Sequence, residues 1–95
     1  MAAYLIADIE LHDTVAYETY RQQVPAIIAK HGGKYLVRGG AVQSVEGGWQ
    51  PQRMVVLEFP TMAQLQAFYN GPDYAPLKDL RISVSHSRIV LVEGL

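Results

Sequence analysis

The sequence contains no cysteine, and this absence removes three kinds of chemistry. The chain can form no disulfide, offer no thiol nucleophile and build no zinc–thiolate site. Long apolar runs are also absent, since no stretch reaches the roughly 18 residues that a membrane-spanning helix needs. The opening segment MAAYLIADIE has no basic region and reaches Asp8 too early for a secretory signal. We therefore expect a soluble, cytoplasmic protein with no membrane partner.

An excess of charge of either sign is missing as well. Eight Lys and Arg residues stand against nine Asp and Glu residues, which gives a formal net charge of −1, and like charges form no run. Proteins that bind nucleic acid normally carry a basic patch, so we expect no nucleic-acid partner. The three histidines follow no metal-binding spacing, and no nucleotide or flavin motif is present. We expect neither a metal nor a cofactor.

What the sequence does contain is a large share of apolar residues for a short chain. Ninety-five residues suffice for a single domain, residues 1–95, and 49% hydrophobic residues are too many for a disordered chain. A domain of this size buries only roughly 60–65% of its unfolded surface, so its core is small. Association with a second copy, most commonly as a two-fold dimer, would bury more apolar surface.

Apolar periodicity predicts strands alternating with helices. The predicted elements are a strand over 3–11, a helix over about 14–30, strands over 34–38 and 53–59, a helix over about 62–70, a turn or short helical piece over 73–81 and a strand over 85–93. Asp13 is the expected N-cap of the first helix, and Thr61 caps the second in a capping box with Gln64. Pro25 removes one backbone donor from the first helix and predicts a kink there.

Two glycine pairs flank the short strand in the stretch KHGGKYLVRGG at 30–40. A phosphate-binding loop places its glycines between a strand and a following helix, and neither pair has that context. Gly32 follows a helix and is expected to be left-handed, whereas the pair at 39–40 predicts a bulge or bend beyond which residues 41–45 can resume the strand. Residues 46–52 read as a loop. We therefore expect both glycine pairs to shape the backbone rather than to bind an anion, and the turns they form position His31 and Arg38.

The order strand, helix, strand, strand, helix, strand is that of a ferredoxin-like βαββαβ fold. We predict an α+β domain with a four-stranded antiparallel sheet and the helices on one face. Apolar side chains nevertheless occupy both faces of the later strands, namely Val55, Leu57, Val90 and Val92. An uncovered apolar face needs a partner. We expect a homodimer in which two sheets pair face to face into a dimeric α+β barrel.

Further motifs give the chain a family resemblance. They are Tyr4, Asp13 with Tyr17 and Tyr20, Pro25, HGGKYLVRGG at 31–40, EGGW at 46–49, Arg53 with VVLEFP at 55–60, YNGPDYAPL at 69–77, Arg81 and VLVEG at 90–94. Over essentially its whole length the sequence resembles the family known as domain of unknown function 1330 (DUF1330), in the dimeric α+β barrel superfamily. The resemblance implies a ferredoxin-like protomer that pairs through its sheets. Its fold relatives include cofactorless monooxygenases, muconolactone isomerases and haem-dependent chlorite-degrading enzymes, so fold alone indicates no reaction.

Two ionisable residues are candidate catalytic groups. His31 has a side chain that titrates near neutrality and suits a general base, although a histidine at a helix C-terminus also stabilises the helix dipole. By strand alternation Glu58 lies on the same face as Met54 and Val56. If that face is buried, the Glu58 carboxylate has to be paired or protonated. The same carboxylate could instead form a Glu–Arg pair that fixes the barrel geometry.

The candidate ligand-binding residues are Arg38, Trp49, Tyr74 and Arg81. Arginine suits a carboxylate because its planar fork binds both oxygens. The indole could pack across a dimer or cover a pocket, and the phenol could point inward. Together with the catalytic candidates they predict a pocket for a small organic molecule between sheet and helices, with cofactor-independent oxygenase or isomerase chemistry as the best enzymatic match. A non-catalytic dimeric interaction or structural module fits the same sequence.

Overall fold

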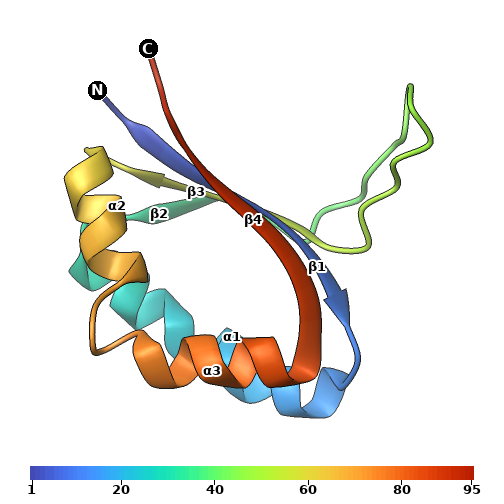
Figure 1. Cartoon of the computed structure of the whole chain (residues 1–95), viewed down its shortest axis with the longest axis horizontal. Coiled ribbons are helices and arrows are strands. Elements are labelled where there is room, and N and C mark those ends of the chain that lie inside the picture. The colour runs from blue at the N-terminus through green and yellow to red at the C-terminus, as the bar shows by residue number, and fades with distance from the viewer.

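The computed structural model describes all 95 residues, and Figure 1 shows a single sheet with the helices gathered on one face. The elements are β1 (Ala3–Leu11), α1 (Thr14–Lys30), β2 (Lys34–Arg38), β3 (Met54–Phe59), α2 (Met62–Tyr69), α3 (Ala75–Val84) and β4 (Ser85–Glu93). The strands lie in the order β2-β3-β1-β4, and each neighbouring pair is antiparallel. The predicted ferredoxin-like arrangement is thereby confirmed. None of the three helices combines the length and apolar character that crossing a membrane requires.

The helix ends follow the sequence signals. The Asp13 carboxylate accepts a hydrogen bond from the Ala16 amide at 3.0 Å and caps α1. Gly32, with φ of +85°, is the left-handed residue that follows the C-cap, and it turns the chain toward the sheet. Thr61 caps α2 by accepting from the Gln64 amide at 3.1 Å. α1 continues through Pro25 as far as Lys30.

One prediction about local structure is wrong, and another is only partly right. Residues 41–45 do not resume β2, because 39–53 form a loop that extends away from the rest of the molecule (Figure 1), and the irregularity in the strand falls between Tyr35 and Val37. Within the segment 73–81, predicted as a turn or short helical piece, residues 75–81 are helical, and they belong to the longer helix α3, which continues to Val84. Its buried residues Leu77, Arg81 and Val84 have helical spacing, but the arginine among them breaks the apolar pattern that a sequence search detects.

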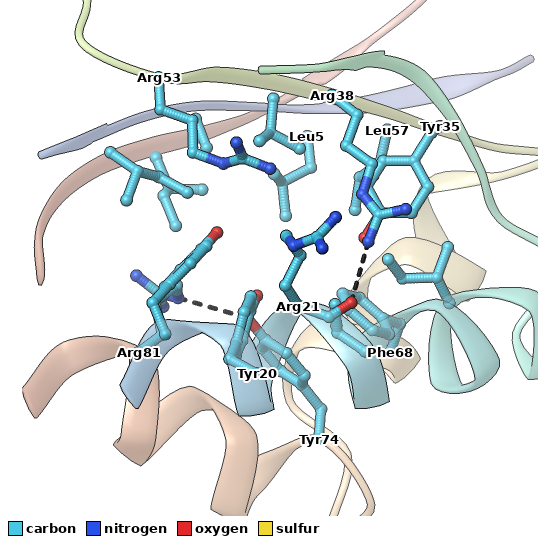
Figure 2. A pocket seen from close by; sticks show the side chains of 17 residues that line it. Leu5, Tyr20, Arg21, Tyr35, Arg38, Arg53, Leu57, Phe68, Tyr74 and Arg81 are labelled. Atoms are coloured by element: carbon cyan, nitrogen blue, oxygen red, sulfur yellow. Dashed lines mark hydrogen bonds between the residues drawn. The ribbon is translucent and has the colours of Figure 1, made fainter. Parts of the chain in front are cut away.

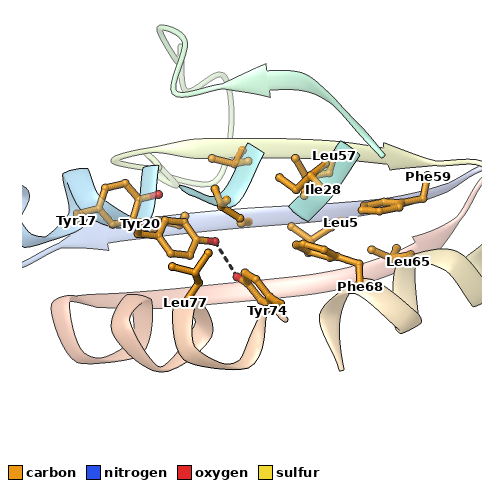
Figure 3. Close-up of a cluster of buried hydrophobic side chains, with 14 of the residues drawn as sticks. Leu5, Tyr17, Tyr20, Ile28, Leu57, Phe59, Leu65, Phe68, Tyr74 and Leu77 are labelled. Carbon is orange, nitrogen blue, oxygen red and sulfur yellow. Dashed lines mark hydrogen bonds between the residues drawn. The ribbon is translucent and has the colours of Figure 1, made fainter. Parts of the chain in front are cut away.

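The core lies between the sheet and the helices. β1 and β3 contribute alternate residues to it, Ala3, Leu5, Ala7, Ile9, Val55, Leu57 and Phe59. Its largest fully buried side chains are Phe59, Phe68 and Leu65, which Figure 3 shows grouped together. Gly33 runs close against this cluster, since a Cβ there would lie 2.5 Å from the Phe59 ring. A side chain at that position would therefore require the aromatic core to shift.

The outer face of the sheet, which points away from the helices, carries a second set of apolar side chains. They are Ile6, Met54, Val56, Val90 and Val92, brought together by the strand registers. Val90 is 58% exposed and Val92 44% exposed. Alternate residues of each strand thus fill the core, and the residues between them point outward, where nothing in the same chain covers them.

Candidate functional site

A cavity lies between the helix-covered face of the sheet and helices α1 and α3 (Figure 2). Its volume is about 30 Å³, room for only about one or two water molecules. Seventeen side chains line it, of which thirteen are apolar or aromatic and four are arginines. No carboxylate, amide or imidazole is among them. The cavity is therefore apolar, and all its formal charge is positive.

Its floor is a hydrogen-bonded set of tyrosines around one buried arginine. The hydroxyls of Tyr20 on α1 and Tyr74 at the start of α3 lie 2.7 Å apart. Arg81 on α3 donates from Nε to the Tyr74 oxygen and from Nη2 to the Tyr69 oxygen, each at 3.3 Å. Arg81 is only 3% exposed. A guanidinium is thus held inside the protein by neutral oxygens alone.

The environment of the phenols fixes their protonation. Burial raises the pKa of Tyr20 well above its usual range, and the adjacent Tyr74 oxygen raises it further. Burial also raises the pKa of Tyr35 on β2, against the opposing influence of the Arg38 guanidinium. Both groups therefore stay protonated at neutral pH. They can donate a hydrogen bond to a ligand, but they keep their protons and do not act as bases.

Arg38 is held at the mouth of the cavity by a backbone oxygen that a proline leaves free. Pro25 has no N–H, so the carbonyl of Arg21, four residues earlier, lacks its helical partner. Arg38 Nη2 donates to that carbonyl at 2.9 Å, and its guanidinium carbon lies 4.7 Å from the centroid of the Tyr35 ring. The proline in α1 thus positions one wall of the cavity.

Arg53 reaches the cavity from the sheet side (Figure 2), because it shares the alternation of Val55 and Leu57, which face the helices. Its guanidinium carbon lies 5.6 Å from the centroid of the Tyr17 ring. The Nε atom is buried and has no hydrogen-bond partner. Gly39, with φ of +70°, leaves space for this guanidinium, into which any Cβ would project. Arg53 therefore presents an unused donor.

Three of the arginines that line the cavity lack an acidic partner. No carboxylate oxygen lies within 4.0 Å of Arg38, Arg53 or Arg81. Of the remaining Lys and Arg residues, all but Lys78 form ion pairs, namely Arg21–Glu18, Lys30–Asp73, Lys34–Glu58 and Arg88–Asp8. Unpaired positive charge is thus concentrated around the cavity.

The structure brings three of the six candidate residues from the sequence together. Arg38, Tyr74 and Arg81 line the cavity, whereas His31, Glu58 and Trp49 do not. The assignment of all six residues to ligand binding or catalysis stays a prediction. Arg38, Tyr74 and Arg81 can be tested together because they line the same cavity.

His31 and Glu58 each have a partner elsewhere. His31 is the C-cap of α1, and its Nε2 lies 3.1 Å from a carboxylate oxygen of Asp73. Glu58 shares a strand face with Met54 and Val56, as alternation predicts, but this is the outer face. Its carboxylate lies 3.3 Å from Lys34 Nζ. The nearby Glu58 carboxylate also raises the pKa of the Tyr4 phenol.

Trp49 comes from the long loop and lies over the outer face. Its Nε1 donates to Asp8 at 3.0 Å, and the same carboxylate oxygen accepts from Arg88 at 2.9 Å. The indole hydrogen bond is the main reason that the pKa of Asp8 is lowered, and Arg88 lowers it further, whereas desolvation opposes both. Trp49 thus belongs to the surface opposite the cavity.

Sequence reasoning did not assign Tyr20 and Arg53 to the site. Tyr20 has the apolar spacing of the buried face of α1 and its ring lies in the core, but the residue also borders the cavity. For Arg53 a usable signal exists, because it lies one residue before β3 and in phase with Val55 and Leu57, which are buried. A charged residue at a position that strand alternation predicts to be buried can be recognised from the sequence.

Comparison with known proteins gives the following likenesses. The model of the domain of unknown function DUF1330 matches residues 2–95. A protein of unknown function from Rhodopseudomonas palustris superposes with a TM-score of 0.79 at 17% identity, over 99% of this chain and 82% of that one. The cofactor-independent oxygenase SnoaB from Streptomyces nogalater gives 0.68 at 11% identity, over 99% and 93%. A dimeric ferredoxin-like protein of unknown function from Jannaschia sp. CCS1 gives 0.67 at 14% identity, over 99% and 100%.

The structural likenesses, at 11–17% identity, establish the fold alone. No curated protein matches the chain in sequence. The family model, in contrast, matches the sequence itself, over residues 2–95 of a chain of 95 residues. The chain therefore belongs to the DUF1330 family.

Proposed function

We propose that the protein binds a small organic molecule in the cavity between sheet and helices and transforms it there. The observation that supports this most directly is the buried Arg81, whose charge has no acidic partner. Burying an unpaired charge costs stability, and such groups are concentrated at functional sites. The mostly apolar lining with a few converging polar groups is typical of small-molecule sites.

Cofactor-independent oxygenase or isomerase chemistry is the activity we infer. The phenol hydroxyls of Tyr20 and Tyr74 can donate a hydrogen bond to a substrate oxygen on which charge develops, and a positive guanidinium beside them stabilises that charge. The fold similarity to SnoaB, described as a cofactor-independent oxygenase, supports this choice by analogy. His31 and Glu58 act in this scheme only if substrate contacts extend beyond the cavity.

A ligand screen tests this proposal. We expect at least one member of a panel of phenols, quinones and lactones to raise the melting temperature of the native protein, because a ligand that binds only the folded state stabilises it. Oxygen uptake and product analysis on the ligands that bind then test turnover. A melting temperature unchanged across the panel would favour the alternative, a non-catalytic dimeric interaction or structural module.

We also propose that two copies pair through the outer faces of their sheets. This face exposes Val90 and Val92, and Trp49 beside them is 52% exposed. Isolated exposed apolar residues are ordinary, but a continuous apolar sheet face marks an interaction surface. The described dimeric state of the Jannaschia protein supports the same arrangement.

The partner prediction is tested by light scattering. We expect the native chain of 10.6 kDa to scatter as a species of twice that mass at micromolar concentration. The Val90→Asp variant should scatter as a monomer, because it places a charge in the middle of the apolar face. Val15→Asp, at a site on α1 that is 83% exposed, is the matched control and should remain dimeric. A native protein that is monomeric even at high concentration would refute the arrangement.

A further inference from the structure

The hydroxyl pair at the cavity floor leaves one of its hydrogens without an acceptor. Tyr20 and Tyr74 bring one hydroxyl hydrogen each, and only one of them can lie in the 2.7 Å bond between the two oxygens. The Tyr74 oxygen already accepts from Arg81. Whichever tyrosine donates to the other, one hydroxyl hydrogen is left with no protein acceptor.

The guanidinium groups add to this excess. Arg81 has five N–H bonds, and two of them are directed at phenol oxygens, at a long 3.3 Å. The Arg53 Nε adds a buried donor that has no partner at all. No side chain that lines the cavity supplies a carboxylate, amide or imidazole acceptor. The lining side chains therefore offer no acceptor beyond the tyrosine oxygens, and their formal charge is positive.

We propose that the missing acceptor is the oxyanion of a small organic acid, a carboxylate or an enolate, bound between Arg53 and the group formed by Arg81, Tyr20 and Tyr74. This inference rests on the proposed function and specifies the chemical class of its ligand. Charge-assisted hydrogen bonds from guanidinium and phenol to a carboxylate are among the strongest available to a protein. The oxyanion supplies both the acceptor and the negative charge that the cavity lacks.

The rest of the lining explains why the ligand is organic rather than an inorganic anion. Beyond the arginines the wall is built from aliphatic and aromatic side chains, including Leu5, Leu57 and Phe68 (Figure 2). A hydrated inorganic ion would lose water to these surfaces without compensation, whereas the hydrocarbon part of an organic acid gains by contact with them. Because the cavity measures about 30 Å³, a ring-sized ligand must displace the side chains at its mouth. Arg38, exposed and held there by one hydrogen bond, is the side chain that has to move.

Titration calorimetry with benzoate and its uncharged near-isostere benzamide tests the inference. We expect benzoate to bind the native protein at least about tenfold more tightly than benzamide, since each charge-assisted hydrogen bond contributes about a factor of ten or more. Arg81→Met should remove that preference, weakening benzoate about tenfold or more while leaving benzamide nearly unchanged. Arg53→Gln should weaken benzoate in the same direction and keeps the test available if the first variant does not fold. Lys30→Gln, at an exposed residue of α1 that lies outside both the cavity and the outer face, is the control and should bind both compounds as the native protein does.

The outcomes separate this inference from the proposed function. If benzamide binds as tightly as benzoate, the cavity is a small-molecule site but the oxyanion assignment is wrong. If neither compound binds and the screen of phenols, quinones and lactones is also flat, both proposals fail, and the unused donors are satisfied by water. Preferential binding of benzoate that survives Arg81→Met and Arg53→Gln would place the anion elsewhere and overturn the assignment.

Discussion

The Arg81→Met variant should be more stable than the native protein, by about 1–4 kcal/mol in free energy of unfolding. Arg81 is 3% exposed and has only phenol oxygens as partners, so folding removes its charge from water without supplying an opposite charge. Methionine fills a similar volume and carries no charge to desolvate. In this variant the Tyr74 and Tyr69 oxygens lose the hydrogen bonds from Arg81, but both hydroxyls can still donate a hydrogen bond.

Urea denaturation at one fixed protein concentration measures this gain, because self-association would make stability depend on concentration. Lys30→Met is the matched control, since Lys30 lies away from the outer face, is paired with Asp73 and has a side chain that is 68% exposed. Its free energy of unfolding should stay within about 0.5 kcal/mol of the native value. A loss of stability in the Arg81→Met variant would instead identify the arginine as a structural residue. It would also favour the non-catalytic module.

The Phe68→Ala variant should lose about 3–5 kcal/mol of stability, a large fraction of the roughly 5–15 kcal/mol of a typical domain. Phe68 is 1% exposed, and its ring centroid lies 5.3 Å from that of Phe59 and 4.5 Å from that of Tyr74. Truncation removes the contacts that join the apolar core to the tyrosine cluster (Figure 3), and the space left cannot be refilled by neighbours already packed.

Thermal unfolding measures this loss, with a fall in melting temperature on the order of 15 °C expected for a domain of this size. Val15→Ala, at an exposed position of α1, should change stability by less than about 0.5 kcal/mol. If Phe68→Ala does not fold, Phe68→Leu should show a smaller loss in the same direction. Native-like stability of Phe68→Ala would mean that α2 contributes little to the core.

The strand pattern made the fold predictable. Alternate residues of β1 and β3 face the helices, and a period of two identifies such strands from sequence alone. The full extent of α3 was not predicted, because one of its buried positions is Arg81 and periodicity searches expect an apolar residue there. The absence of a strand over 41–45 could not be predicted either, since pairing with a neighbouring strand is a property of the whole sheet.

The site was predictable only in part. Arg38, Tyr74 and Arg81 were selected as polar residues within apolar surroundings, and they do converge on one cavity. Glu58 was selected by the same criterion but has the opposite strand phase and faces away from the helices. The meeting of Tyr20 with Tyr74, 54 positions apart in the chain, depends on how α1 packs beside α3, which no local pattern encodes.

The chain contains a single tryptophan, and its position makes it an optical reporter for one surface only. Trp49 lies over the outer face, hydrogen-bonded to Asp8, whereas four of the six tyrosines border the cavity. Indole emission shifts to shorter wavelength when water is removed from the ring, and tyrosine absorbance responds to a new partner at the phenol. Pairing of two sheets and entry of a ligand therefore produce separate spectral signals, which one unlabelled sample of the protein can report together.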